Sequence, residues 1–396
     1  MSMAPGETPE ERGRVIIERA RAIAPLAAEA ADETERESRL PQRLVDAIVE
    51  AGLFKMLAPR ELGGSEADFR AYVLAAEALG AADASTGWCL VQAGHAGFTM
   101  APRLEKDAAL EVFGAPDAVL AGGSGPSYGR ADAVDGGYVL NGTWDFASGC
   151  KHSSWFDTRA LIWREGKLEV NDAGVSPVHS MAVARKDVEI IDHWNVRGMR
   201  GTGSHRYVVK DVFVPRSRAT EMYGSGGWAE GPMYRVPGLG AAHLAFTSVA
   251  LGAAGAMLDD LIALATAKTP NFSRQRLADS VTLQATVARA QGKLRAARAY
   301  RDQAVALAWS EASAGRVSTA ARGEVRLAGI HGLDAAVEIV EATYRAAGTT
   351  AIFDHNTIHR RFQDVHVMSQ QLFGRTAHYE NIGKLALGVE FDRGAL

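Results

Sequence analysis

Trp144-Asp145-Phe146-Ala147-Ser148-Gly149 lies in a run of strand-forming residues in the middle of an otherwise helical sequence. Alternate side chains of a strand share a face, so the pattern predicts that Trp144, Phe146 and Ser148 point the same way. Two aromatic rings, a hydroxyl group and a glycine that permits close backbone approach could form a wall for a flat polar ring. The same alternation also occurs in a half-buried strand whose apolar face packs in the core, and alternation is primarily a burial signal.

The sequence on either side of this stretch divides into three regions. Short runs such as Tyr138-Val139-Leu140 and Tyr207-Val208-Val209, separated by Gly and Asp turns, indicate strands. Helical spacing of apolar residues dominates before and after them. The sequence therefore predicts an N-terminal helical domain (1–116), a central β domain (117–220) and a C-terminal helical bundle (221–396).

The composition narrows the class of protein. The 396 residues are 47% hydrophobic and 23% charged, which is typical of a globular protein. A net charge of −4 without a polybasic run argues against a nucleic-acid or membrane-surface partner. The N-terminus resembles no signal peptide, and the apolar stretch 236–267 is interrupted by Pro237 and the Asp259-Asp260 pair. Cys89 and Cys150 form no metal set or disulfide framework, so we expect a cytoplasmic protein without a metal site.

Three further segments resemble the acyl-CoA dehydrogenase fold superfamily, in order and over nearly the whole chain. They are LFKMLAP at 53–59, WNVRGMRGTGS at 194–204, and GTTAI at 348–352 followed by RFQD at 361–364. The resemblance implies an α+β, acyl-CoA dehydrogenase-like fold. Its parts would be an N-terminal helical domain, a central β-barrel-like domain and a C-terminal four-helix bundle.

The dehydrogenases of that superfamily need a carboxylate base to remove a substrate proton. The two segments where they carry it, here 366–373 and 241–258, contain no acidic residue. The chain is more similar to the two-component flavin monooxygenases of the same fold. This resemblance implies FMNH₂ or FADH₂ supplied by a separate NAD(P)H:flavin reductase, O₂, and a C4a-hydroperoxyflavin that oxygenates a small aromatic or heteroaromatic substrate. It also implies a homotetramer.

Three positions match flavin-side residues of those monooxygenases. Ser148 matches the hydroxyl beside flavin N5, and Phe146 matches the aromatic residue at the ring edge. Ser124, within Gly122-Gly123-Ser124-Gly125, matches another flavin-side position, where backbone N–H groups approach a polar ring or phosphate. The alternatives are a serine satisfied by neighbouring backbone and a common glycine-rich turn.

Other residues match the substrate side. His95 matches a histidine that takes a phenol proton or holds the substrate, although a lone histidine between apolar runs is often a core residue. Gln371 stands where many relatives carry a second histidine, and an amide can hydrogen-bond but cannot act as a base. His366 lies near it in sequence and could substitute. Trp228, in the glycine-rich segment 223–240, is a candidate wall of the pocket.

Four positions match contacts to the phosphate end of the flavin. Arg274 resembles an arginine that family members extend to the phosphate, often across a subunit boundary. Gly348, Thr349 and Thr350 match the loop that closes over that end. The alternatives are a solvated arginine at a helix start and a glycine that ends the preceding helix.

Two rival functions remain open at this point. One is an acyl-CoA dehydrogenase-type α,β-desaturase with a displaced base, for which Glu230 is a candidate. The other is a degenerate, non-catalytic member that only binds a ligand. The intact strand motif at 144–149 argues against the second.

Overall fold

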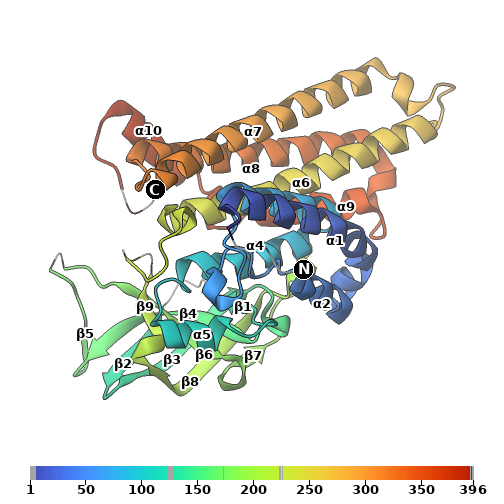
Figure 1. Cartoon of the computed structure of the whole chain (residues 1–396). Helices are drawn as coiled ribbons and strands as arrows, with labels where there is room; N and C mark the ends of the chain where they lie inside the picture. The colour runs from blue at the N-terminus through green and yellow to red at the C-terminus, as the bar shows by residue number, and fades with distance from the viewer. Residues whose placement is uncertain are drawn as a thin grey trace.

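A computed structural model describes residues 6–123, 128–172, 174–222, 224, 226–392 and 394. A layer of long helices lies over a twisted sheet, with the N-terminal and C-terminal helices side by side (Figure 1). The helices are α1 (Pro9–Glu37), α2 (Gln42–Glu50), α3 (Phe69–Ala82), α4 (Ala84–Thr99), α5 (Lys106–Phe113), α6 (Gly238–Ala267), α7 (Val281–Ser313), α8 (Thr319–Ala347), α9 (Thr357–Ser369) and α10 (Ala377–Leu387). The strands are β1 (Leu120–Gly122), β2 (Gly129–Val134), β3 (Gly137–Ala147), β4 (Trp155–Arg164), β5 (Lys167–Leu168), β6 (Val178–Ala184), β7 (Glu189–Ile191), β8 (His205–Pro215) and β9 (Ala219–Glu221).

The helices before and after the sheet share one hydrophobic core. Its buried residues come from α1, α3 and α4 and from α6, α7 and α8. The backbones of α3 and α6 approach closely, since a Cβ added to Gly80 would lie 2.7 Å from the Val249 Cα atom. A Cβ added to Gly252 would lie 2.3 Å from the Glu77 carbonyl oxygen. The helical segments predicted on either side of the β domain therefore form a single layer.

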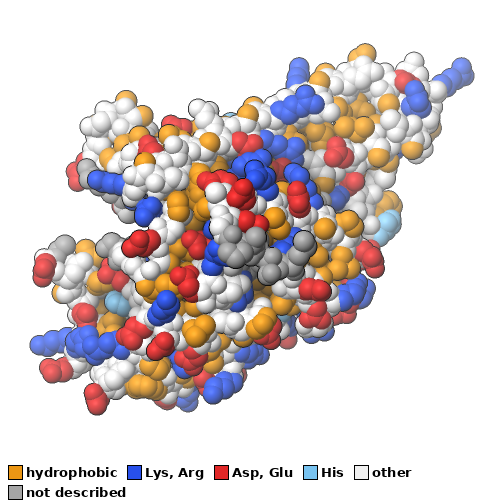
Figure 2. Space-filling model, in the orientation of Figure 1, with side chains coloured by type: hydrophobic (Ala, Val, Ile, Leu, Met, Phe, Trp, Pro, Cys, Tyr) orange, Lys and Arg blue, Asp and Glu red, His pale blue; other side chains and the backbone are white. Residues whose placement is uncertain are grey.

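Helix α6 is long and apolar enough to cross a membrane by length and composition alone. In the fold, 61% of its most apolar window is buried inside the protein. It packs between α3 and α8, and its apolar character therefore fits a core helix that is covered on several sides. Acidic and basic side chains are interspersed over the face of the molecule in Figure 2.

The central region is a mixed sheet with the order β7-β8-β3-β2-β4-β6-β9, and β1 and β5 also pair with β4. Its own core contains Trp144, stacked on Tyr207 with the ring centroids 5.0 Å apart. The Phe156 ring also contacts Tyr207, with the ring centroids 4.8 Å apart. The Trp144 Nε1–H donates to the Arg159 carbonyl oxygen at 2.9 Å, so its polar atom is satisfied within the sheet.

A β-bulge corrects the predicted alternation of 144–149. Trp144 pairs with Tyr207 and Ala147 with His205, so β3 carries one extra residue there. Phe146 adopts a left-handed backbone (φ 64°) and is 54% exposed, whereas Trp144 is 1% exposed. The expectation that Trp144 and Phe146 share a face was wrong, because the extra residue turns the Phe146 side chain out of the core.

The segment between β7 and β8 is tied to helix α9 by a buried carboxylate. Asp364 is 2% exposed, and its Oδ1 atom accepts the Met199 N–H at 2.6 Å. Burial raises the pKa of Asp364 to about 8, and the negative charges of Asp83 and Glu35 act in the same direction. The Met199 hydrogen bond and the positive charge of Arg360 oppose this rise.

Replacing Asp364 by Asn should make the stability of the fold less dependent on pH. The pKa of Asp364 in the folded protein, about 8, lies above the value of 3.8 for an exposed Asp. The stability that protonated Asp364 contributes is fully present below pH 3.8 and is lost as the pH rises through 8. Over this range the free energy of unfolding falls by up to about 1.4 kcal/mol per pH unit. Asn retains an acceptor for the Met199 N–H and carries no charge.

The measurement is the free energy of unfolding by denaturant at a series of pH values. We expect D364N to gain stability relative to the wild type as the pH rises from about 5 to about 8. The exposed Asp172→Asn change is the control and should leave the pH profile unchanged. Parallel profiles for D364N and the wild type would contradict the assignment.

Candidate active site

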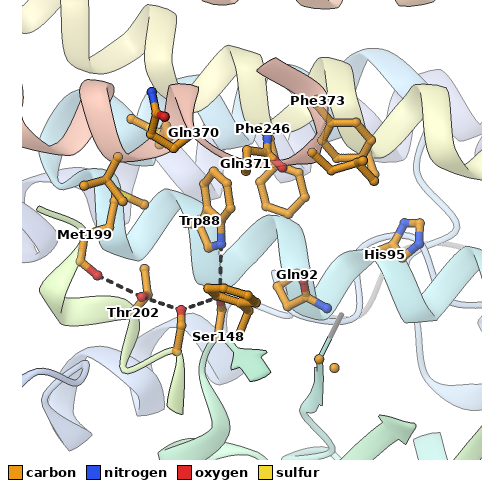
Figure 3. A pocket seen from close by; sticks show the side chains of 18 of the residues that line it. Trp88, Gln92, His95, Ser148, Met199, Thr202, Phe246, Gln370, Gln371 and Phe373 are labelled. Carbon is orange, nitrogen blue, oxygen red and sulfur yellow. Dashed lines mark hydrogen bonds between the residues drawn. The ribbon is translucent and has the colours of Figure 1, made fainter. Parts of the chain in front are cut away.

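A cavity of about 660 Å³ lies between the sheet and the helical layer. Its volume is that of a small-molecule or cofactor site. Figure 3 shows His95 well to one side of Ser148, with Gln92 between them and the aromatic residues Phe246 and Phe373 above. The cavity is lined from α4, α6, α9 and the turn after it, from β4 and the ends of β1 and β3, and from the segment 194–204. The lining residues are Trp88, Gln92, His95, Gly122, Gly123, Phe146, Ser148, Arg159, Trp194, Val196, Met199, Thr202, Ser204, Ala242, Phe246, Val367, Met368, Gln370, Gln371, Leu372, Phe373 and Arg375.

Helix α4 supplies one long wall of the cavity. Trp88, Gln92 and His95 are spaced i, i+4 and i+7, so they lie along a single helix face. The helix begins at Asp83, whose carboxylate accepts the Thr86 N–H at 2.7 Å. Seven residues of helix span about 10 Å, which separates the two ends of this wall by roughly the length of a fused ring system.

Ser148 lies at one end in a buried hydrogen-bonded chain. Its Oγ accepts the Trp88 Nε1–H at 3.0 Å and lies 2.7 Å from the Ser204 Oγ atom. Ser204 Oγ lies 2.6 Å from Thr202 Oγ1, and Thr202 donates to the Met199 carbonyl at 2.8 Å. The serine predicted from the strand motif is therefore fixed by side chains from distant segments, rather than by neighbouring backbone.

Phe146 and Trp194 form an aromatic corner beside Ser148. Their rings meet edge to face with the centroids 6.2 Å apart. Gly149, at φ 78°, ends the turn, and its N–H donates to the Thr202 carbonyl at 2.8 Å. Both predicted flavin-side residues of the strand motif thus line the cavity, and the third, Ser124, lies outside the described residues.

His95 lines the opposite end and is 6% exposed. Its ring meets Phe98 edge to face at 5.3 Å. Burial lowers the pKa of His95 to about 3, and the positive charges of Arg159 and Arg103 act in the same direction. His95 is therefore a neutral imidazole at neutral pH, and its low pKa makes it a weak base that suits hydrogen bonding better than proton abstraction.

Gln371 lines the cavity from the turn just beyond α9, rather than from a helix face. Gln370 and Phe373 line it from the same turn. His366 is not among the lining residues. Its Nδ1 atom pairs with the Phe362 carbonyl at 2.9 Å, and its Nε2 atom lies 3.5 Å from a carboxylate oxygen of Glu341. His366 is thus held on the α8 side of α9 and does not replace a histidine at Gln371.

Trp228 is also not among the residues that line the cavity. Its Nε1–H donates to the Leu104 carbonyl at 3.1 Å and its backbone N–H to the Pro102 carbonyl at 2.9 Å. The Lys106 ammonium lies 5.2 Å from the centre of its ring. Trp228 packs against the connection between α4 and α5, so its side chain does not form the expected wall.

The four residues predicted at the phosphate end lie away from this cavity. Arg274 is exposed in the connection between α6 and α7. Gly348, Thr349 and Thr350 form a 3₁₀ turn after α8. The Lys268 ammonium joins the two segments by donating to Thr350 Oγ1 at 2.7 Å. In Figure 1 the connection between α6 and α7 lies at the upper right tip of these long helices, far from the sheet.

The cavity lining is cationic and lacks a carboxylate. Arg159 and Arg375 line it, and none of the described lining residues is Asp or Glu. Glu230 is exposed and is not among them, so it does not supply the base that a dehydrogenase requires. Gln92, Arg159 and Ser204 also line the cavity, and no sequence pattern predicts Gln92 or Arg159 there. Ser204 belongs to the recognisable segment 194–204, which is the one signal that could have indicated it.

The helical parts of the chain match a known protein family. Residues 11–105 match the family described as acyl-CoA dehydrogenase, N-terminal domain. Residues 244–374 match acyl-CoA dehydrogenase, C-terminal domain. The matched segments are the two that build the helical layer, and the fold is the one expected from the sequence.

Several relatives of this chain are named as monooxygenases or hydroxylases. The chain is 30% identical to an indole-3-acetate monooxygenase of Pseudomonas putida over 90% of each chain. It is also 30% identical to the oxygenase component of an FADH₂-dependent resorcinol hydroxylase of Rhizobium sp. over 98% of each. The solved structure of XiaF from Streptomyces sp., in complex with FADH₂ and glycerol, superposes with a TM-score of 0.87 at 25% identity and covers 96% of each chain. This chain therefore belongs to the flavin-dependent monooxygenases of the acyl-CoA dehydrogenase fold.

Proposed function

We propose that this monooxygenase uses reduced flavin and O₂ to oxygenate a small aromatic carboxylate. The observation that carries the proposal is the polarity of the cavity. An aromatic corner with a hydroxyl group lies at one end, and a neutral imidazole with a nearby guanidinium lies at the other. The first end suits a flavin ring and the second suits an anionic aromatic substrate.

The Ser148 end fits a flavin by the chemistry of its side chains. Phe146 and Trp194 offer apolar surface to a flat ring, and Ser148 offers a hydroxyl oxygen to a ring nitrogen. Reduced flavin, when bound, supplies the electrons that activate O₂, so that one oxygen atom enters the substrate and the other leaves as water. The buried side chains around it would exclude bulk water from this chemistry.

The opposite end would hold the substrate. Phe246 and Phe373 provide an apolar roof for an aromatic ring. His95, Gln92 and Gln371 provide hydrogen bonds to its polar groups. Because its lowered pKa makes the imidazole a weak base, His95 would position the substrate rather than ionise it. This arrangement favours an electron-rich ring that needs no strong base.

Arg159 would bind the carboxylate of the substrate. It projects from β4 into the cavity close enough to His95 to lower the pKa of that imidazole. Asp157, two residues earlier on the same face of the strand, is buried and electrostatically coupled to Arg159, which would hold the guanidinium in place. The relative named indole-3-acetate monooxygenase carries a substrate of this class in its name.

The phosphate end of the flavin would be held by a second copy of the chain. Arg274 and Thr350 lie at exposed helix ends away from the cavity of their own chain. Their predicted contacts with the flavin would then be made across a subunit boundary, as in a homotetramer. A separate cytoplasmic reductase would supply the reduced flavin, as the term oxygenase component implies for the resorcinol hydroxylase.

Turnover with labelled oxygen tests the function. The protein should convert an indole- or phenyl-acetic acid to a product with one oxygen atom from isotopically labelled O₂, when anaerobically reduced FMN or FAD is supplied. Mass spectrometry of the product and assay of hydrogen peroxide are the measurements. Flavin reoxidation at the rate of free flavin, with no product from any aromatic acid tested, would contradict the function. Anaerobic bleaching of bound flavin by an acyl thioester would favour the desaturase.

Replacing Arg159 by Met should discriminate between charged and neutral substrates. Loss of a charge-assisted hydrogen bond should lower kcat/KM for the carboxylate at least about tenfold more than for its amide analogue. Arg164→Met is the matched control, because Arg164 lies on the same strand, pairs with Glu169 and does not line the cavity. Equal losses for acid and amide would contradict the role of Arg159.

Replacing Arg274 by Ala should weaken flavin binding about tenfold without changing the oligomeric state, because a phosphate contact is lost. Arg276→Ala is the control, since Arg276 already pairs with Asp279. Light scattering measures the assembly, and equilibrium dialysis measures flavin affinity. Mixed assemblies of R274A and Phe146→Ala chains should regain activity. Some sites in them combine the intact Phe146 of one chain with the intact Arg274 of another. If the wild-type protein were a monomer that binds flavin with full affinity, binding of the phosphate end by a second chain would be excluded.

A further inference from the structure

Three hydroxyl groups form a buried chain between two fixed end points. We call Ser148, Ser204 and Thr202 the hydroxyl chain. Their side chains are 5%, 5% and 2% exposed, so bulk water does not compete strongly for these bonds. One end is the Trp88 Nε1–H and the other is the Met199 carbonyl oxygen, and Figure 3 shows all four hydrogen bonds.

The chemistry of the two ends sets the direction of every bond between them. The Met199 carbonyl can only accept, so Thr202 donates to it and can then only accept from Ser204. Ser204 donates its only hydroxyl proton to Thr202 and therefore accepts from Ser148. The Trp88 N–H can only donate, and it donates to Ser148. Ser148 is therefore left with one unused lone pair and no unused proton.

We infer that the hydroxyl chain makes Ser148 a hydrogen-bond acceptor toward the cavity and so selects reduced over oxidised flavin. This inference rests on the proposed placement of the flavin ring beside Ser148. Reduced flavin carries a hydrogen on N5 and donates there, whereas the N5 atom of oxidised flavin has a lone pair and accepts. An acceptor at Ser148 pairs with the first and opposes the second.

Oxidised flavin could still bind if every hydrogen bond of the hydroxyl chain reversed its direction, but this reversal costs free energy. In the reversed arrangement, Thr202 donates to Ser204, Ser204 to Ser148, and Ser148 to the ligand. The bond from Thr202 to the Met199 carbonyl is then lost. That carbonyl still accepts the Trp194 Nε1–H at 3.0 Å, so the cost is one ordinary hydrogen bond rather than a buried unsatisfied carbonyl.

The selection suits an enzyme that does not reduce its own flavin. Such a protein must bind the reduced form released by another protein and must release the oxidised form after turnover. A preference of about fivefold follows from one ordinary net hydrogen bond. It would appear as a rise of about 20 mV in the midpoint potential of the bound flavin, since tenfold corresponds to about 30 mV for a two-electron couple.

Two variants that interrupt the hydroxyl chain test the inference. Ser204→Ala removes the acceptor of the Ser148 proton, and Thr202→Val removes the acceptor of the Ser204 proton. In both, the Ser148 proton becomes available to oxidised flavin. We expect the ratio of the oxidised to the reduced dissociation constant to fall about fivefold in each variant. Anaerobic equilibrium dialysis with chemically reduced or oxidised flavin measures both constants, and spectroelectrochemistry measures the potential.

Ser153→Ala is the matched control. Ser153 is a buried serine outside the hydroxyl chain, and its hydroxyl donates to the Cys150 carbonyl at 3.0 Å. In this variant the ratio of the oxidised to the reduced dissociation constant should stay at the wild-type value. Mere loosening of the site would weaken both redox states together and leave the ratio unchanged, which would overturn the inference. Failure of the wild type to bind flavin in either state would instead contradict the proposed function.

Discussion

The β-bulge at the end of β3 is the constraint on which the cavity depends. An ideal strand would place Trp144 and Phe146 on one face. The extra residue keeps Trp144 in the sheet core against Tyr207 and turns Phe146 outward. The strand ends at Ala147, and the turn that follows brings Ser148 under Trp88. A left-handed phenylalanine is conformationally unfavourable, and here it forms part of a cavity wall.

The helical layer provides the rigid frame against which that turn is placed. The close approach of α3 and α6, permitted by Gly80 and Gly252, joins segments from both ends of the sequence in one core. Helix α4, packed in the same layer, presents Trp88, Gln92 and His95 on one face. The cavity lies where this frame meets the sheet, so every wall comes from a different part of the chain. A site built on helices and strands holds its groups more precisely than one built on loops alone.

The electrostatics of the cavity follow from burial rather than from residue type. His95 is an ordinary histidine in the sequence, and burial with two nearby guanidinium groups keeps it neutral. Asp364 is an ordinary aspartate, and burial raises its pKa to about 8 while its carboxylate orients the segment that contains Met199. Both effects depend on desolvation, which is a property of the folded chain.

Much of the fold and part of the site could be predicted from the sequence. Local periodicity and turn residues separated helices from strands, and the segments at 53–59, 194–204 and 348–364 indicated the superfamily. His95, Phe146, Ser148 and Gln371 were predicted for the site and do line the cavity, although their roles stay predictions. Trp228 lies elsewhere, because its indole is held by carbonyl groups that no local pattern reveals.

The sequence by itself determined which elements form and which chemical family the chain resembles, because both depend on local spacing and on short ordered motifs. Only the tertiary structure decided which side chains meet. Ser148 is hydrogen-bonded to side chains 60 and 56 positions away in the sequence, and Arg159 reaches the same cavity from β4, so packing decides these contacts. The direction of a hydrogen bond and the charge of a buried imidazole are likewise set by surroundings that exist only once the chain has folded.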